Sequence, residues 1–456
     1  MIINFFKKQY SSLLQYPWKD TIKSLKFLPR VLNNFEKVAV IVCLAVAVTL
    51  GSYLWYQSWL KSTILIAGYG GEFREGIIGE SKDLDEHIER LTNAGLTKYD
   101  SEKNIVGDLA QSWDINENGK VYIFHLRDGF SSEDLTSQIA SKNIWKDIEI
   151  TTPDSQTIRC AFKQPFSPFL NVSTEPIFNY GPYKIAKEYK DEIELQSRDD
   201  YYAGRPFIDK VIIKFYNSEE DLLKAAKRGE IQAYSLDSEQ DPVQNFHKFE
   251  MKLPRDLDLF FNLSRKDLQD INVRRALKEG SSPGKELSLR LVTSDNPKNK
   301  DFAQRIVETL GEKGVKINLD VKDNVTLQKV TIPKRDYDLL LYGLDYGEDP
   351  DPYPFWHSSQ IKEDGKNLSN FKNVKADKLL EEARQELDNN KREEKYAEFQ
   401  KILDAEIPMF VVQKQNFYYY VSNKIKGIEQ IVGSCEADRF LNVASWYINT
   451  QRVKKL

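Results

Sequence analysis

The chain contains few of the residues that usually carry out catalysis or hold a metal. Its 456 residues include three cysteines and four histidines. The cysteines form no CxxC or Cys/His spacing of the kind that binds zinc, and the histidines are scattered along the chain. No phosphate-binding loop, Rossmann fingerprint or Ser-His-Asp arrangement is present. We therefore expect a protein that is not an enzyme, with no catalytic residue, no metal site and no cofactor.

A strong excess of one charge is also absent. Sixty-five Lys and Arg stand against 69 Asp and Glu, which gives a formal net charge of −4. After the first 37 residues the basic side chains are interspersed with acidic ones, so we expect no nucleic-acid partner. The length indicates two or three domains with a substantial core.

Long hydrophobic runs are missing except at residues 38–55. These eighteen residues carry no charge, which is just enough to cross the ~30 Å core of a bilayer as a helix that rises ~1.5 Å per residue. Aromatic residues typical of a membrane interface crowd the end of the run, namely Tyr53, Trp55, Tyr56 and Trp59. The sequence therefore predicts a transmembrane helix over residues 38–56.

The residues before this helix predict its orientation. Residues 1–37 contain seven basic and two acidic side chains, a net charge of +7 − 2 = +5. The positive-inside rule places this basic arm in the cytoplasm. The rest of the chain carries −4 − 5 = −9 and would lie outside, as the extracellular or periplasmic part of a single-pass protein of the cell membrane.

Two other interpretations of the apolar run fit less well. A cleaved signal peptide normally has a much shorter arm, and no small-x-small cleavage site follows the run. Cys43 is a poor lipidation site because Val42 precedes it, where the bacterial lipobox requires a small residue. We therefore expect an uncleaved signal anchor.

The most informative soluble segment covers residues 179–234. A Gly-Pro turn at 181–182 leads into a strand, and a YYAGRP turn at 201–206 leads into the β-forming run VIIKF at 211–215. A helix that stops at Gly229 follows. The segment contains no nucleophile, metal ligand or phosphate loop, so it reads as scaffold.

Further motifs occur in a fixed order on both sides of this segment. They are LAQSW at 109–113, YIFHLRDG at 122–129, FNLS at 261–264, VRRAL at 273–277, and DPDP at 349–352 after a strand at 337–343. Together, over residues 64–427, they resemble the family 5 extracellular solute-binding proteins. These are the peptide and nickel receptors of ABC importers.

The resemblance implies an α/β fold of the type II periplasmic-binding-protein kind, with two lobes, mixed sheets and a hinge. The expected parts are a first lobe at 60–256 plus 428–456, a hairpin subdomain inside it at about 95–170, a second lobe at 257–427, and crossings near 257–262 and 422–427. Alternating strand, helix and strand over 287–341 independently predicts a parallel α/β lobe.

The resemblance also implies a function. A membrane-anchored receptor would capture oligopeptides or similar small solutes between its lobes and deliver them, as a monomer, to ABC permease subunits. The segments at 130–145 and after 277 are shorter than in the family, which indicates a more open pocket or a different ligand. The alternatives are a surface receptor or scaffold that no longer serves transport, and a binder of a metal chelate or sugar.

The acidic segment at 345–352 provides the candidate ligand contacts. In the family's peptide receptors an aspartate just before the Asp-Pro element pairs with the peptide's α-ammonium group, whose pKa of about 7.7–8.0 keeps it mostly cationic. By position this role falls to Asp345, with Glu348 second. The alternative is a solvated acidic turn in which Asp349 and Asp351 cap the next segment.

Aromatic side chains could contact the apolar parts of a ligand. The candidates are Tyr346, Tyr342, Trp356 and Trp113. The alternative for each of them, which is the commoner one for an aromatic residue, is a place in a hydrophobic core.

Overall fold

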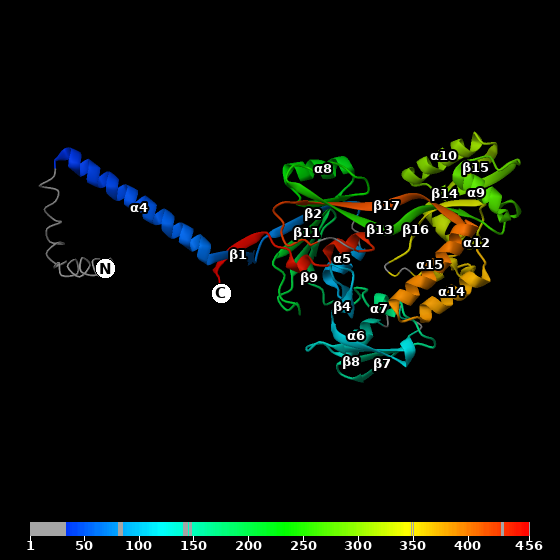
Figure 1. The fold of residues 1–456 in the computed structure, drawn as a ribbon, viewed down its shortest axis with the longest axis horizontal. Helices are drawn as coiled ribbons and strands as arrows, with labels where there is room; N and C mark the ends of the chain where they lie inside the picture. The colour runs from blue at the N-terminus through cyan, green and yellow to red at the C-terminus, as the bar shows by residue number, and fades with distance from the viewer. Residues whose placement is uncertain are drawn as a thin grey trace, which may run out of the picture. The chain divides into compact units, whose positions relative to one another are not determined.

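The computed structural model describes residues 33–80, 85–139, 145, 148–347, 349, 351–429 and 433–455. Most of the predicted basic arm therefore lies outside the described residues. The chain divides into two units, one of residues Met1–Ala67 with Thr450–Leu456 and one of residues Gly68–Asn449. Each unit is described by itself (Figure 1).

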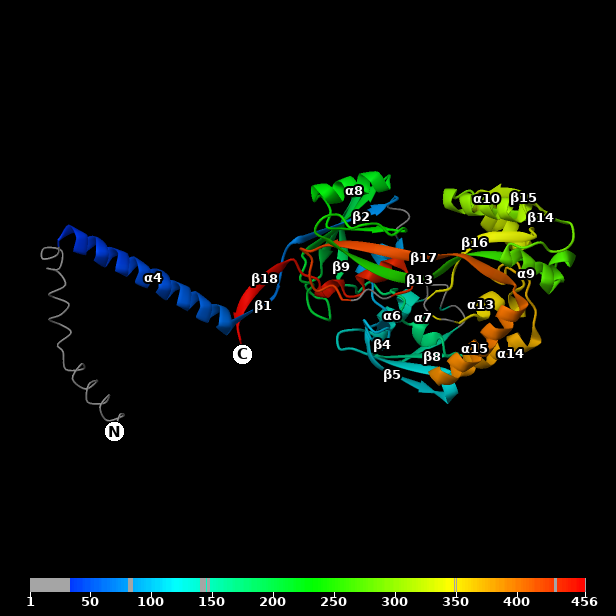
Figure 2. The same ribbon diagram turned by 45° about the horizontal axis from the view of Figure 1, so that its top comes forward.

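The first unit contains helix α4 (Asn34–Ser62) and the paired strands β1 (Thr63–Gly68) and β18 (Asn449–Lys454). The Asn33 side chain and the Glu36 carboxylate each accept a hydrogen bond from the other's backbone N–H, both at 2.9 Å, so the helix begins with a capping box. None of its residues is buried. The helix extends beyond the predicted 38–56 at both ends, and β1 follows it directly, with β18 alongside (Figure 2).

The second unit is built on a ten-stranded mixed sheet in the order β15-β14-β16-β13-β17-β12-β2-β11-β10-β9. Its strands are β2 (Glu72–Ile78), β9 (Tyr183–Glu188), β10 (Glu192–Ser197), β11 (Lys210–Tyr216), β12 (Ala233–Leu236), β13 (Phe246–Phe261), β14 (Leu287–Ser294), β15 (Val315–Lys322), β16 (Leu339–Asp345) and β17 (Met409–Ser422). Pairs such as β14–β15 are parallel and pairs such as β13–β17 are antiparallel, as the sequence predicted.

A separate antiparallel sheet forms the hairpin subdomain. Its strands are β5 (Ala110–Asn116), β6 (Val121–Leu126), β7 (Glu149–Asp154) and β8 (Thr157–Ala161), with the short pair β3 (Thr97–Tyr99) and β4 (Ile105–Gly107) beside it. Strands β7 and β8 pair antiparallel and form a hairpin within this sheet.

The helices of the second unit flank these sheets. They are α5 (Asp85–Thr92), α6 (Ser132–Ile139), α7 (Phe169–Val172), α8 (Glu219–Arg228), α9 (Ile271–Glu279), α10 (Pro297–Gly311), α11 (Asn324–Thr326), α12 (Ile332–Lys334), α13 (Tyr353–Trp356), α14 (Val374–Gln385) and α15 (Asn389–Glu406). Local signals fix several ends. The Ser218 hydroxyl caps the start of α8, and Gly229, at φ 72°, takes the left-handed conformation that ends it.

Strands β14, β15 and β16 pair in parallel with α10 packed on them, which confirms the predicted α/β lobe. Helix α10 begins at Pro297, where the Asn296 side chain accepts hydrogen bonds from the N–H groups of Lys298 and Asn299 and so caps the helix.

Two long strands cross the middle of the second unit. The first part of β13 pairs with residues 416–422 of β17 and its last part with residues 409–414, and the register shifts between Lys252 and Asp256. Phe417 and Tyr419 pack in the first-lobe core, whereas Leu257 lies in the second-lobe core. We propose that the lobes meet at this shift, so that the second crossing lies near residues 414–416 instead of the expected 422–427.

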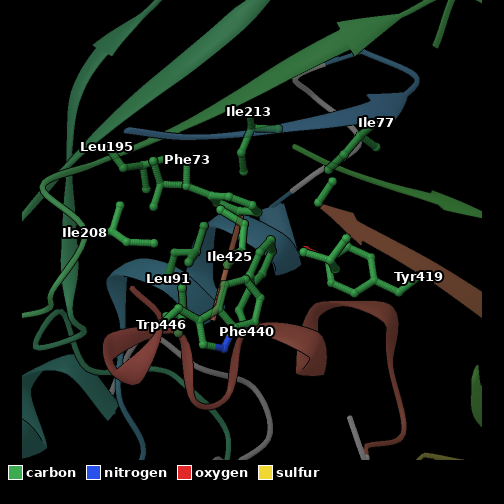
Figure 3. Close-up of a cluster of buried hydrophobic side chains, with 14 of the residues drawn as sticks. Phe73, Ile77, Leu91, Leu195, Ile208, Ile213, Tyr419, Ile425, Phe440 and Trp446 are labelled. Carbon is green, nitrogen blue, oxygen red and sulfur yellow. The ribbon is translucent and has the colours of Figure 1, made fainter. Parts of the chain in front are cut away.

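The core of the first lobe joins residues that are far apart in the sequence. Phe73 on β2 meets Trp446 edge to face at 5.6 Å between ring centroids, and Leu91 and Phe440 pack around them (Figure 3). Phe440, Val443 and Trp446 of the C-terminal segment therefore belong to the same core as β2.

The cysteines of the second unit do not pair. Cys160 and Cys435 are both free and buried. Cys160 lies inside the hairpin-subdomain core. The two residues are therefore separate thiols.

One ion pair is completely buried under the first-lobe core. The Glu75 carboxylate lies 2.6 Å from Arg439 Nη2 and accepts a hydrogen bond from the Tyr419 hydroxyl at 2.8 Å. Arg439 Nη1 also contacts His87 Nδ1 at 2.8 Å. The pair links β2, β17 and the C-terminal segment, and each of its charges depends on the other for solvation.

The substitution Arg439→Met tests this dependence. It leaves the Glu75 carboxylate buried without a cation, so we expect the free energy of unfolding to fall by about 3–5 kcal/mol in chemical denaturation. The double variant Glu75→Gln with Arg439→Met removes both charges and should recover much of this loss. Equal destabilisation of the single and double variants would contradict the interpretation.

Candidate ligand-binding cleft

A cavity of about 460 Å³ lies where three parts of the second unit face one another. Helix α5 contributes Glu86 and Arg90, the α7 region contributes Phe166 to Glu175, and the second lobe contributes Asp345 to Arg384. A site between domains is where small ligands usually bind, and this volume falls within the ~300–1,000 Å³ common for such sites.

Asp345 lines this cavity but is already paired. It ends β16 directly opposite Arg255 on β13, and its carboxylate lies 2.8 Å from Arg255 Nη2. The backbone N–H of Gly347 also donates to it, at 2.9 Å. The Asp345 side chain is still 44% exposed, so a ligand cation could reach it but would share it with Arg255.

Tyr346 also lines the cavity, and buried groups hold it in place. Its hydroxyl donates to Asp258 Oδ2 at 2.7 Å, and its ring meets Phe355 edge to face at 5.0 Å. Asp258 is completely buried. Burial raises the pKa of Asp258 to about 7, the hydrogen bond from Tyr346 opposes this shift, and the nearby Asp256 adds to it.

The other predicted contacts do not line this cavity. Trp356 is buried in the second-lobe core, and Tyr342 packs at the edge of the same core and accepts a hydrogen bond from Gln328. Trp113 packs against the hairpin-subdomain core. For these three residues the core interpretation fits the structure better. Glu348 lies outside the described residues.

The alternative role of the acidic turn is visible in its hydrogen bonds. Asp349 Oδ1 accepts from the N–H of Asp351 at 2.8 Å, and Asp351 Oδ1 accepts from the N–H of Tyr353 at 3.1 Å. Asp351 also binds Arg384, whose guanidinium lies over the Tyr353 ring at 3.8 Å. These two aspartates therefore order the segment that leads into α13.

A set of hydrogen bonds joins the α7 region to the second lobe at one side of the cavity. The backbone N–H of Ser167 donates to the carbonyl of Arg384 at 2.8 Å, and the Ser167 hydroxyl donates to the carbonyl of Ala383 at 3.4 Å. The Asn171 amide donates to Asp349. We call these contacts the α7–α14 seam. Ser167 thus binds two carbonyls in the last turn of α14, one of which, on Ala383, also accepts from the backbone N–H of Glu386 at 3.2 Å.

Sequence patterns gave no signal for several of the lining residues. Glu86 and Glu175 come from the first lobe, and Arg90 between them binds Asp438 at 2.6 Å. Glu175 is exposed, yet the surrounding protein reduces its hydration and raises its pKa, with Arg90 opposing and Glu86 adding to the shift. These residues share no motif because folding alone brings them together.

The charges of the described lining residues do not balance. Five carboxylates, on Glu86, Glu175, Asp345, Asp349 and Asp351, face three cations, on Arg90, Lys366 and Arg384. This excess of negative charge favours a ligand that carries a positive group.

Comparison with known proteins agrees with this architecture. The family described as bacterial extracellular solute-binding proteins, family 5 (middle region), matches residues 133–281. The oligopeptide-binding protein AppA of Bacillus subtilis is 23% identical over 342 residues, which are 59% of this chain and 61% of AppA. The probable D,D-dipeptide-binding periplasmic protein DdpA of Escherichia coli is 23% identical over 435 residues, 72% of this chain and 84% of DdpA.

The fold comparison covers more of the chain. The solved structure of Bacillus subtilis AppA in complex with a nonapeptide matches with a TM-score of 0.67 at 19% identity, over 84% of this chain and all of that one. Residues 133–281 therefore match the family 5 extracellular solute-binding proteins in sequence, and most of the chain shares the fold of such a protein. The two-lobed fold predicted from its motifs is therefore confirmed.

A second, larger groove lies next to the cleft cavity. Its volume is about 990 Å³, and it shares Tyr346 and Asp351 with the cavity. Trp356, Phe399 and the first residues of β17 line it, with Asp256 and Lys414 at the strand crossing. Tyr346 thus separates two hollows that both adjoin the proposed junction of the lobes.

The substitution Asp258→Asn tests the burial of this carboxyl group. Because the folded-state pKa of about 7 exceeds the ordinary value of about 3.9, the folded state keeps a proton that the unfolded state has lost. The free energy of unfolding therefore falls as the pH rises from about 4 to 7. Between pH 5 and pH 8 the free energy of unfolding of the wild type should decrease. We expect this decrease to be about 2 kcal/mol smaller in the Asp258→Asn variant.

Thermal unfolding across this pH range measures the effect. Tyr346→Phe removes the hydrogen bond that favours the charged form, so in this companion variant the pH-dependent loss should extend to higher pH. Parallel pH profiles for the wild type and Asp258→Asn would contradict the assignment.

Proposed function

We propose that this protein is a membrane-tethered receptor that captures a peptide or similar small solute in the cleft cavity and delivers it to an ABC permease. The observation that carries the proposal is that α5, the α7 region and the second lobe together line one cavity. The residues that line it include more carboxylates than cations. Closure of the lobes on a ligand would use the crossing of β13 and β17 as its hinge.

A free peptide matches this cavity chemically. Its α-ammonium group can pair with a carboxylate in the cleft, and its backbone can form hydrogen bonds with the walls. Asp345 remains our proposed partner for the ammonium group, with Arg255 as its competitor for the carboxylate. A volume of about 460 Å³ favours a short ligand.

The same cavity supports binding without chemistry. No histidine is among its described lining residues, and its one described cysteine, Cys435, has a pKa raised by burial and by Asp438, which keeps the thiol protonated. A reactive nucleophile beside a base, which acyl or phosphoryl transfer would need, is therefore not formed by the described lining.

Helix α4 supports the membrane tether. It is 29 residues long, none of which is buried, and its apolar part is long enough to span a bilayer. With the basic arm of residues 1–37 before it, we propose a single-pass protein with a cytoplasmic N-terminus and an extracellular or periplasmic receptor unit.

Capture of a ligand by the full chain in detergent tests the proposal. After exposure to a peptide mixture and washing, mass spectrometry should recover short peptides with a free amino group. Glu86→Gln with Glu175→Gln should reduce recovery, whereas the same change at Glu312 and Glu393, which are exposed on the second lobe, should not. Recovery of only a sugar or metal chelate would refute the peptide ligand.

The substitution Asp345→Asn tests the ammonium contact. We expect the affinity for a captured peptide to fall about tenfold, or about 1.4 kcal/mol, with no change for its N-acetylated form. Because Arg255 competes for the carboxylate, Arg255→Gln should strengthen binding of the free peptide. Asp364→Asn, at an exposed residue that does not line the cavity, is the control. Calorimetry with both peptide forms measures the effect, and equal losses for both would exclude the contact.

A further inference from the structure

The outer end of α4 carries a small folded element that the receptor function does not use. Residues 59–67 and 450–455, which we call the stalk, form the last turn of the helix and the paired strands β1 and β18. Lys455 N–H donates to the Ser62 carbonyl at 2.9 Å. Arg452 Nη1 donates to the Thr63 hydroxyl at 3.1 Å, and its guanidinium lies 5.1 Å from the centre of the Trp59 ring.

The charge of the stalk has one sign. It contains Lys61, Arg452, Lys454 and Lys455, all exposed, and no acidic residue. The first unit carries eleven basic and two acidic residues in total, a net charge of +9, so the unit of residues 68–449 carries −4 − 9 = −13. The stalk is therefore positively charged, whereas the unit of residues 68–449 has a net negative charge.

The stalk also exposes apolar side chains. Ile64, Leu65 and Ile66 on β1 are 43%, 57% and 37% exposed. Trp55 and Trp59 on the adjoining helix are exposed as well. An isolated two-stranded sheet is only marginally stable in water, and consecutive bare apolar residues on a strand are normally covered by something.

We propose that the stalk lies in the headgroup layer of the outer leaflet and binds the phosphates of anionic lipids. The proposal rests on the proposed membrane span of α4. Since β1 continues that helix without a loop, the apolar residues of β1 start at the membrane interface, where Trp and the aliphatic parts of Lys and Arg are favoured. The four cations then meet lipid phosphates, an attraction that acts within about one Debye length of the surface.

The position of the cations in the sequence agrees with this role. Only Lys61 lies near the outer end of the helix in the sequence, so the excess of basic residues before the helix still favours a cytoplasmic N-terminus. The other three cations come from residues 450–455 and reach the interface only when β18 pairs with β1. Folding thus adds positive charge outside without changing the signal that orients the helix.

Hydrogen exchange on the full chain in nanodiscs tests the proposal. One set contains phosphatidylcholine alone and the other contains phosphatidylcholine and phosphatidylglycerol at 3:1. We expect amides of β1 and β18 to exchange about tenfold more slowly in the anionic discs, because lipid binding suppresses opening of the two-stranded sheet, and 0.5 M salt should remove the difference.

Variants separate this effect from general charge. Lys454→Gln with Lys455→Gln should abolish the lipid dependence, whereas Lys313→Gln with Lys316→Gln, at exposed positions of the other unit, should leave it intact. Equal exchange in both lipids, or the same loss in both variants, overturns the proposal. Protection that depends on two copies per disc, or on added permease and not on lipid charge, also overturns it.

A separate measurement isolates failure of the membrane span. If alkaline extraction of cell membranes releases the full chain, α4 is not an anchor, and both the tether and the stalk proposal fail. If the chain stays in the membrane and exchange ignores lipid charge, only the stalk proposal fails.

Discussion

The pairing of β13 with β17 is the constraint on which the rest of the receptor unit depends. These two strands are the longest of the ten-stranded sheet, and each contributes side chains to the cores of both lobes. The hydrogen-bond ladder between them is interrupted only near residues 252–258. A sheet bends most easily where its register shifts. The same two strands that join the lobes therefore also determine where they can move.

The cleft shows how burial and charge work against each other in this protein. The buried Glu75 carboxylate is matched by Arg439, because an unpaired buried charge would be too costly. At the cavity Glu86, Glu175 and Asp345 are exposed, and the lining carboxylates outnumber the lining cations. The unmatched charge lies where a ligand could neutralise it. Asp345 combines features of the buried pair and of the exposed carboxylates, because it is paired with Arg255 and is still accessible to a ligand.

The sequence predicted what local patterns determine. Gly229 marked the end of a helix, and the alternation of strand, helix and strand over 287–341 marked the parallel lobe. The ordered motifs, through their resemblance to the family, implied the two-lobed fold. It could not predict the partner of Asp345, because Arg255 is 90 residues away and only the register of β13 against β16 brings them together. Glu86 and Glu175 in the cleft were missed for the same reason.

For aromatic residues the sequence could not decide between a place in a core and a ligand contact. The residue type of Trp113 and Trp356 fits a ligand-stacking role as well as a core role. Only the packing of whole elements shows that they lie in or against cores. Strand β17 reads as one uninterrupted strand, so its sequence gives no sign of the crossing near residues 414–416 that we propose in place of 422–427. Nothing in its own residues shows that its partners change from one lobe to the other.

The α7–α14 seam has a consequence for how this protein can vary. Ser167 binds main-chain carbonyls of Ala383 and Arg384, so the side chains at these two positions can change without loss of its hydrogen bonds. A one-residue insertion within α14 is different, because it would rotate the following carbonyls by about 100° around the helix axis. The seam therefore tolerates substitution in α14 but fixes its length, and relatives that keep this contact should differ there in residue type and not in residue number.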